Sequence, residues 1–198
     1  MLNWLRRFLP QRSPRMVITG ERCFIRMFTP ADAEQLAQFL LRNREAWSTF
    51  EPIHKPYYYT TEAQRKKIIE GNYLAQKQRE FTFGVFIEEQ LIGHIALYAV
   101  KRLPYKSGFV GYAIDAKYEG QGIMTEAIQL VQRFAFERLS LHRLEAYVAP
   151  ANISSQRVLQ KTGFVEEGLL RQLLWLNGKW EDHYLYAMLK QQYQKKQR

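Results

Sequence analysis

The segment from Lys117 to Gly122 has the residue types and the spacing to hold a phosphate group. It reads Lys-Tyr-Glu-Gly-Gln-Gly and separates a strand-like run, residues 109–114, from an amphipathic run that begins at Ile123. Where a strand leads into a helix, free backbone N–H groups converge with the positive end of the helix dipole, and glycines let a phosphate approach closely. A tight turn that needs two glycines would have the same spacing, so the loop alone is only a candidate.

Two familiar phosphate-binding motifs do not fit this loop. A P-loop ends in Gly-Lys-Ser or Gly-Lys-Thr, whereas Gly122 is followed by Ile123 and Met124. A dinucleotide-binding fingerprint would place a third glycine at position 125, which is Thr125 here, and it belongs to an early βαβ unit. Both motifs therefore fit this loop poorly.

The residues around the loop do resemble the cofactor motif of one enzyme superfamily. Residues 113–127 are similar to the pattern Gln/Arg-x-x-Gly-x-Gly/Ala of the GNAT N-acetyltransferases, with Lys117 where glutamine or arginine is usual. Lysine keeps a positive charge there but lacks the planar fork of arginine. A second stretch, residues 142–164, resembles the next conserved block of the superfamily and carries Asn152 and Ser155.

The last part of the chain resembles one branch of that superfamily. Asn177-Gly178 and Asp182-His183 are similar to the closing hairpin of the ribosomal-protein-alanine N-acetyltransferases (RimJ/RimL-like), and the similarity extends from residue 18 to residue 189. The resemblance implies direct transfer of acetyl from acetyl-CoA to an amine, without a metal or a covalent intermediate. It also implies a pyrophosphate on the backbone amides of residues 121–125 and a pantetheine arm along the strand before them. The residues that the resemblance assigns to the cofactor are Tyr112, Ala113, Ile114, Lys117, Gly120, Gln121, Gly122, Ile123, Met124, Thr125, Asn152 and Ser155.

Such a transfer requires a neutral amine and a proton for the leaving thiolate. Ser155 stands where related enzymes place a serine or tyrosine as proton donor, although a helix-capping or cofactor-contacting hydroxyl is the alternative. Glu51 lies in the irregular segment that borders the acceptor in similar proteins, so it is the carboxylate expected to orient or deprotonate the amine; a solvated glutamate is the alternative. Tyr98 shares a strand face with His94 and Ala96 and is a third catalytic candidate, with core packing as the alternative. We expect His94 to be a hydrogen-bonded sheet histidine.

The identity of the base is left open by one departure from the family. Some relatives carry a glutamate in the strand after Gly163-Phe164, whereas residues 169–176 contain only Arg171 as a charged residue, and Leu174 occupies the corresponding position. The base is therefore Glu51, a chain of water molecules, or absent. An α-amine, with a pKa near ~7.7–8.0, demands less of a base than a lysine near ~10.4.

The apolar periodicities predict an α/β fold that carries these residues on one mixed sheet. Hairpins make antiparallel pairs, while the strands on either side of the helix at residues 123–135 are joined by a crossover and run parallel. By resemblance, the sheet is mostly antiparallel, has about six to seven strands, is splayed at the CoA site and is flanked by about four helices. The expected strands are residues 23–28, 81–87, 91–100, 109–114, 143–148, 169–176 and 179–189, and the expected helices end near residue 47, begin after residue 60, and cover residues 123–135 and 152–162.

The composition is that of a globular protein in a reducing compartment. The 198 residues, 46% apolar and 14% aromatic, suit a single domain with a sizeable core. Cys23 is the only cysteine, which excludes internal disulfides and thiolate metal clusters and indicates a cytoplasmic setting. We expect a basic and apolar extension at residues 1–17, with neither a secretory signal nor a membrane span, one acetyltransferase domain at residues 18–189, and a basic tail at residues 190–198.

The acceptor is open to three hypotheses. The first is a protein N-terminus, with a ribosomal protein as one target, because the formal charge of +10 would favour an approach to ribosomal RNA. The second is a small amine such as an antibiotic, polyamine or amino acid, although the acidic residues wanted around a polycation are only scattered. The third is a non-catalytic module of the same fold that binds acyl-CoA or RNA. The oligomeric state, monomer or homodimer, is equally open.

Overall fold

The computed structural model describes residues 16–196 as one mixed sheet with helices on both faces. The strands are β1 (Val17–Thr19), β2 (Phe24–Met27), β3 (Phe81–Ile87), β4 (Gln90–Lys101), β5 (Ser107–Ile114), β6 (Arg143–Val148), β7 (Val165–Leu176) and β8 (Lys179–Leu189). The α-helices are α1 (Ala33–Trp47), α2 (Thr61–Gln76), α3 (Ile123–Arg133), α4 (Ile153–Thr162) and α5 (Lys190–Lys196), and a π-helical turn, Phe134–Arg138, continues α3.

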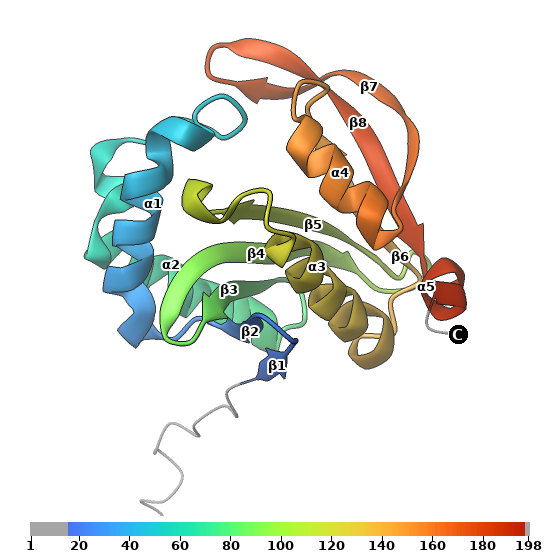
Figure 1. Cartoon of the computed structure of the whole chain (residues 1–198), viewed down its shortest axis with the longest axis horizontal. Helices are drawn as coiled ribbons and strands as arrows, with labels where there is room; N and C mark the ends of the chain where they lie inside the picture. The colour runs from blue at the N-terminus through green and yellow to red at the C-terminus, as the bar shows by residue number, and fades with distance from the viewer. Residues whose placement is uncertain (1–15, 197–198) are drawn as a thin grey trace, which may run out of the picture.

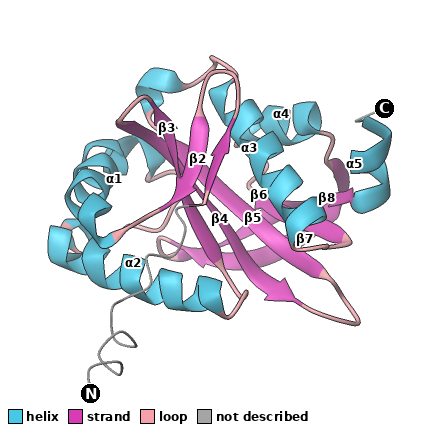
Figure 2. Cartoon of the chain, turned by 90° about the horizontal axis from the view of Figure 1, so that it is seen from below, coloured by secondary structure: helices cyan, strands magenta, loops and turns pink. Residues whose placement is uncertain are grey.

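The strands are arranged in the order β1-β2-β3-β4-β5-β6-β8-β7. Every neighbouring pair in this sheet is antiparallel except β5 and β6, which are parallel because α3 crosses over between them. Helices α1 and α2 cover one face, and α3, α4 and α5 cover the other (Figures 1 and 2). The predicted crossover and both predicted hairpins are confirmed.

The sheet separates two apolar clusters because its side chains alternate between faces. On β4, Ile95 and Leu97 are fully buried against α3, while His94 lies on the opposite face, against α1. The cluster on that second face joins Phe39 of α1 to Ile68 of α2. Helices α3 and α1 are each packed by one apolar stripe, as their periodicity predicts. On α2 only part of the expected stripe is packed: Ile68 is buried, but Ile69 and Tyr73 are exposed.

The sheet opens between β5 and β6. These strands pair only from Ser107 to Phe109, whereas β6 pairs with β8 along its whole length on its other edge. Residues of an antiparallel pair alternate in the direction of their backbone groups, and the amide of Asp115 donates to the Ile92 carbonyl of β4. The backbone groups of Tyr112 and Ile114 therefore point away from β4, into the opening. The splay implied by the resemblance is present.

The two ends of the sheet region differ from the expectation. The sheet has eight strands rather than six to seven, since β1 pairs with β2 but is too short to show an alternating pattern. Helix α5 lies in the segment expected to be a tail, and its only buried side chain in the described part is Tyr193, so the sequence there is too polar to predict a packed helix. Of the expected N-terminal extension, residues 1–15 lie outside the described residues, and Val17 already belongs to β1.

Two kinds of feature are absent from residues 16–196. No helix among residues 16–196 has the length and apolar character to cross a membrane. Within the same range, no group of three or more His, Cys, Asp or Glu side chains is arranged to hold a metal ion.

Candidate active site

The glycine loop starts from a fixed carboxylate at the end of β5. Asp115 accepts a hydrogen bond of 3.1 Å from the amide of Lys117 and one of 2.7 Å from Arg42 on α1. Burial by itself would raise the pKa of Asp115, but these hydrogen bonds hold it below its ordinary value. Asp115 therefore fixes the start of the loop by binding the backbone of Lys117 and the side chain of Arg42 on α1.

The two glycines have backbone conformations that favour glycine. Gly120 and Gly122 have φ angles of +70° and +78°, in the left-handed region that side chains make costly. Gly122 is the N-cap of α3 and has no side chain with which to cap it. The first backbone N–H groups of a helix have no acceptor within the helix, so those of residues 123–125 are directed out of this helix end. Such an end favours an anion.

A cation from a distant part of the chain lies beside this helix end. Arg22, in the turn between β1 and β2, donates 2.9 Å to the carbonyl of Gln121 and pairs with Glu126 of α3 at 3.4 Å. A Cβ atom built on Gly122 would lie 2.9 Å from the guanidinium of Arg22. Arg22 thus packs directly over the glycine and places a positive charge beside this helix end.

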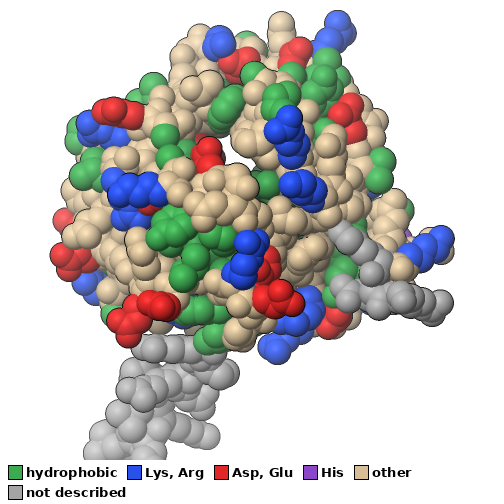
Figure 3. Space-filling view, in the orientation of Figure 1, with side chains coloured by type: hydrophobic (Ala, Val, Ile, Leu, Met, Phe, Trp, Pro, Cys, Tyr) green, Lys and Arg blue, Asp and Glu red, His purple; other side chains and the backbone are tan. Residues whose placement is uncertain are grey.

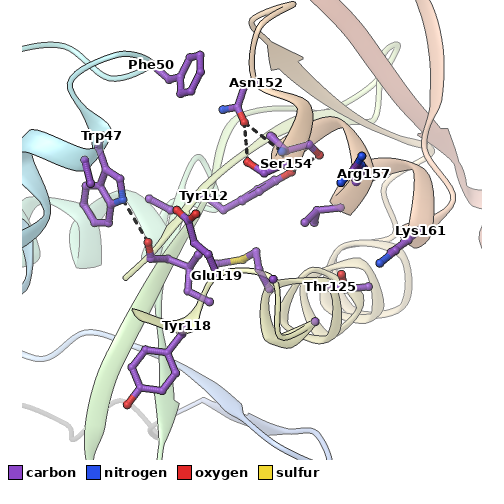
Figure 4. A pocket seen from close by; sticks show the side chains of 18 of the residues that line it. Trp47, Phe50, Tyr112, Tyr118, Glu119, Thr125, Asn152, Ser154, Arg157 and Lys161 are labelled. Carbon is purple, nitrogen blue, oxygen red and sulfur yellow. Dashed lines mark hydrogen bonds between the residues drawn. The ribbon is translucent and has the colours of Figure 1, made fainter. Parts of the chain in front are cut away.

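A cavity of about 440 Å³ extends from this helix end along β5 to the end of α1. Arg157 and Lys161 of α4 border it on one side, and Trp47 of α1 borders it on the other (Figure 4). Trp47 donates 3.1 Å to the carbonyl of Ile114, one of the backbone groups that point into the sheet opening. Figure 3 shows the same face hollowed between the α1 and α4 sides, with Lys and Arg side chains on the α4 side.

Two hydroxyl groups meet where β5 and β6 diverge. The Tyr112 hydroxyl lies 2.8 Å from the Ser155 hydroxyl and donates 3.1 Å to the Ser155 carbonyl. Asn152 caps α4 by accepting a 3.1 Å hydrogen bond from the Ser155 amide, which fixes the first turn of that helix (Figure 4). Burial raises the pKa of the Tyr112 phenol well above its ordinary value, so Tyr112 keeps its proton at neutral pH. The pair can therefore supply a hydrogen bond to an anion in the cavity.

Glu51 is at the opposite side of the same cavity. Its residue surface is exposed, but desolvation by the surrounding cavity raises the pKa of its carboxyl group. Burial, followed by the charges of Tyr147 and Glu51, raises the pKa of the Tyr98 phenol. A carboxylate with a raised pKa in a cavity is a suitable general base for an amine.

Comparison with known proteins identifies the family. A family model described as the acetyltransferase (GNAT) domain matches residues 22–165. The chain belongs to the GNAT acetyltransferase family. This acetyltransferase is 40% identical over 175 residues to the probable N-acetyltransferase YjcK of Bacillus subtilis, with 87% of this chain and 97% of the relative covered.

Two solved structures show the same fold as this acetyltransferase. The ribosomal-protein-S5-alanine acetyltransferase of Vibrio fischeri has a TM-score of 0.85 and 31% identity, covering 88% of this chain and 97% of that one. Mycobacterium smegmatis RimJ, solved in complex with CoA-disulfide, has a TM-score of 0.81 and 26% identity, covering 88% of this chain and 85% of that one. The expected family, and the similarity to its ribosomal-protein branch, are confirmed.

Most residues of this acetyltransferase that the sequence assigned to the cofactor or to catalysis surround the cavity. The residues that line it are Glu51, Tyr112, Ala113, Ile114, Gly120, Gly122, Met124, Thr125, Asn152 and Ser155. The side chains of Lys117 and Gln121 are exposed, that of Ile123 is buried in the core, and none of these three residues lines the cavity. Tyr98 does not line the cavity; its ring stacks on Phe109 instead.

The structure corrects one expectation and adds residues that the sequence did not suggest. His94 is not hydrogen-bonded as expected: Nδ1 is buried without a partner among the described residues, with the rings of Phe39 and Trp47 around it. Burial lowers the pKa of His94 to about 4, so it is neutral. Arg22 and Trp47 were missed because each reaches the site from a segment far from both motifs. No local sequence pattern distinguishes an arginine in a turn, or an aromatic residue at a helix end, as part of a site.

Proposed function

We propose that this GNAT enzyme transfers an acetyl group from acetyl-CoA to an amine, and that its acceptor is the α-amine of a protein N-terminus. One observation carries the proposal: a single cavity joins the glycine loop at the start of α3, the unpaired edge of β5 and the carboxylate of Glu51. An anion site, an extended hydrogen-bonding edge and a base are the parts that amide formation from a CoA thioester requires.

The residues of the cavity fit acetyl-CoA. The amides of residues 123–125 would hold the pyrophosphate, assisted by Arg22 beside Gly122. The backbone groups of Tyr112 and the amide of Ile114, which face the opening, would hold the pantetheine arm as a strand would, while the Ile114 carbonyl is bound by Trp47. When bound, acetyl-CoA supplies an activated acetyl thioester. The neighbouring M. smegmatis structure contains a CoA derivative, which supports the same assignment for this chain.

Two side chains at opposite ends of the cavity handle the protons of the reaction: Glu51 accepts one from the amine, and Ser155 donates a hydrogen bond to the leaving group. Glu51 accepts a proton from the ammonium form of the acceptor, directly or through water, and its raised pKa brings it closer to that of an amine. Ser155 donates a hydrogen bond to the leaving sulfur, while the Tyr112 hydroxyl, 2.8 Å from the Ser155 hydroxyl, donates to the Ser155 carbonyl and holds the first turn of α4 beside the cavity. Each step is a proton transfer or a hydrogen bond, so neither requires a covalent bond to the protein.

The charges around the cavity support an α-amine rather than a polycation as acceptor. The carboxylates that line it are Glu51 and Glu119, and they are balanced by Arg157 and Lys161. A polyamine would want a surplus of negative charge. An α-amine also needs less help from a base than a lysine side chain does. The V. fischeri relative is named for an alanine of a ribosomal protein, and we extend that acceptor class to this chain.

The test is acetyl transfer from acetyl-CoA to a panel of acceptors, followed by mass spectrometry. The panel holds peptides with a free N-terminal alanine or serine, the same peptides with a blocked N-terminus and an internal lysine, and small amines including spermidine. We expect acetylation of free N-termini alone. Transfer mainly to small amines or to internal lysines would overturn the acceptor assignment, and binding of acetyl-CoA without any transfer would overturn the activity.

A further inference from the structure

The tip of the β7–β8 hairpin contacts the loop that carries Glu51. Asn177 and Gly178 form the tip, with φ angles of +50° and +96°, and the strands pair on either side of it from Leu176 to Lys179. This left-handed geometry explains why asparagine and glycine occupy the turn. The turn itself does not require the side-chain amide of Asn177, which is available for contacts with other segments. Figure 1 shows the tip reaching across to the segment that follows α1.

The side chain of Asn177 makes three hydrogen bonds to that segment. Its Oδ1 accepts from the amide of Ile53 at 2.8 Å, and its Nδ2 donates to the carbonyls of Ser48 at 3.0 Å and of Glu51 at 3.1 Å. Both N–H groups and the oxygen of the amide are thus engaged, on both sides of Glu51. These contacts join parts of the chain more than 120 residues apart.

The contacts of Asn177 complete the hold on the backbone of Glu51. The amide of Glu51 donates 2.9 Å to the carbonyl of Trp47 at the end of α1, and the carbonyl of Glu51 accepts from Asn177. The segment between α1 and the 3₁₀ turn at Pro56–Tyr59 has no regular secondary structure of its own. Both backbone polar groups of Glu51 are therefore hydrogen-bonded, the amide to α1 and the carbonyl to the hairpin.

We infer that Asn177 is a positioning residue, which holds the carboxylate of Glu51 in the cavity by fixing the backbone around it. The inference rests on the proposed role of Glu51 as the base. Without the amide of Asn177, the loop moves toward solvent, the Glu51 carboxylate becomes better hydrated, and its geometry relative to the acceptor loosens. A small displacement of a catalytic group is enough to lower the rate strongly.

The variant that tests this is Asn177→Gly, because glycine keeps the left-handed turn and removes only the amide. Its matched control is Glu88→Gly at the tip of the β3–β4 hairpin, where Glu88 has a similar φ of +52° and lies outside the site. A second variant, Asn177→Asp, keeps the acceptor for the Ile53 amide but loses both donors. All three are compared with Glu51→Gln and with the double variant Glu51→Gln/Asn177→Gly.

We expect Asn177→Gly to lower kcat about 10-fold while the KM for acetyl-CoA is unchanged, and Glu51→Gln to lower kcat by ~10²-fold. The double variant should be no slower than Glu51→Gln alone. Two readouts need no acceptor: hydrogen exchange at Ile53 should accelerate in Asn177→Gly, less so in Asn177→Asp, and the NMR-measured pKa of Glu51 should fall toward its ordinary value. The control Glu88→Gly should change none of these.

The outcomes separate the two proposals. Unchanged Ile53 exchange and an unchanged Glu51 pKa in Asn177→Gly would overturn the positioning role. An equal loss of kcat in the presence and absence of the Glu51 carboxylate would also overturn it, because it would mean that Asn177 acts independently of Glu51. Full activity in Glu51→Gln would instead overturn the role of Glu51 in the proposed function.

Discussion

At the scale of single residues, desolvation raises the pKa of two groups in the site, Tyr112 and Glu51. Tyr112 keeps its proton because burial opposes formation of a phenolate, and it therefore remains a donor next to Ser155. Glu51 has a raised pKa for the same reason, desolvation, but it needs to lose its proton before it can accept one from an amine. The proposed acid and the proposed base thus stand at opposite sides of the cavity, and each can be tested alone.

The first prediction concerns the hydroxyl pair. Ser155→Ala should lower kcat by ~10²-fold, the range for loss of a general acid, with little change in CoA affinity. Tyr112→Phe removes the two contacts of the phenol hydroxyl with Ser155 but keeps the serine itself, and it should lower kcat less. Steady-state kinetics gives kcat, and calorimetric titration gives the affinity for CoA. Parallel losses of rate and affinity in Ser155→Ala would show that the serine is a cofactor contact rather than the proton donor.

The second prediction concerns stability and pH at Glu51. The folded-state pKa of Glu51 is raised above its unfolded value, so the folded protein binds more protons than the unfolded chain within that window, and stability falls as pH rises through it. Glu51→Gln removes this loss. Its Tm, relative to the parent protein, should therefore increase from about pH 4 to neutral pH in scanning calorimetry. Parallel Tm curves for the two proteins would contradict the raised pKa.

At the scale of elements, the site is made by the junction of β5, the glycine loop and α3. The strand supplies unpaired backbone groups only because β6 leaves it after Phe109, and the helix supplies free amides only because Gly122 caps it without a side chain. Arg22 closes over that glycine from the β1–β2 turn. The loop's function therefore depends on the absence of a Cβ atom at one position.

The third prediction is that Gly122→Val weakens CoA binding by about 10-fold or more, since the valine would occupy the space beside Arg22 and strain a positive φ. Gly120→Ala is the matched control: its φ is also positive, but a Cβ there meets nothing within 4 Å. It should lose stability without a comparable loss of affinity. Calorimetry measures the CoA affinity of both variants. An affinity of Gly122→Val equal to that of the parent protein would refute the placement of the pyrophosphate.

At the scale of the whole molecule, the C-terminal helix completes the core behind the catalytic face. Tyr193 of α5 is 5% exposed, its ring centre lies 5.1 Å from that of Phe136, and its hydroxyl donates 2.6 Å to Glu137. Burial, followed by the hydrogen bond to Glu137, raises the pKa of Tyr193 to about 12, so the phenol stays protonated. The helix that continues α3 is thereby joined to the end of the last strand.

The fourth prediction is that Tyr193→Ala lowers the free energy of unfolding by about 3–5 kcal/mol, the usual range for deleting a buried aromatic side chain, whereas Tyr193→Phe costs about 1 kcal/mol. Tyr73→Ala on α2, where the tyrosine is 58% exposed, should change stability by less than about 0.5 kcal/mol. Urea unfolding measures all three. Similar losses at positions 73 and 193 would show that α5 does not pack as a part of the core.

The sequence by itself was sufficient wherever a local pattern carried the information. The alternation along β4, the apolar stripe of α3 and the turn at Asn177-Gly178 predict their elements because each depends on neighbours within a few residues. The glycine loop and its position before a helix likewise show where an anion can bind. Beyond these, the resemblance to a family, and not the residues alone, directed attention to Ser155 and Glu51.

Only the tertiary structure decided which distant residues meet. The chain folds so that Arg22 covers Gly122, Trp47 reaches the carbonyl of Ile114, and Asn177 holds the loop of Glu51. It also leaves His94 without the hydrogen bond that its place in a strand suggested. The physical reason is common to all four: a long-range contact is set by how strands and helices are placed relative to one another, and residues far apart in the chain carry no local pattern that records it.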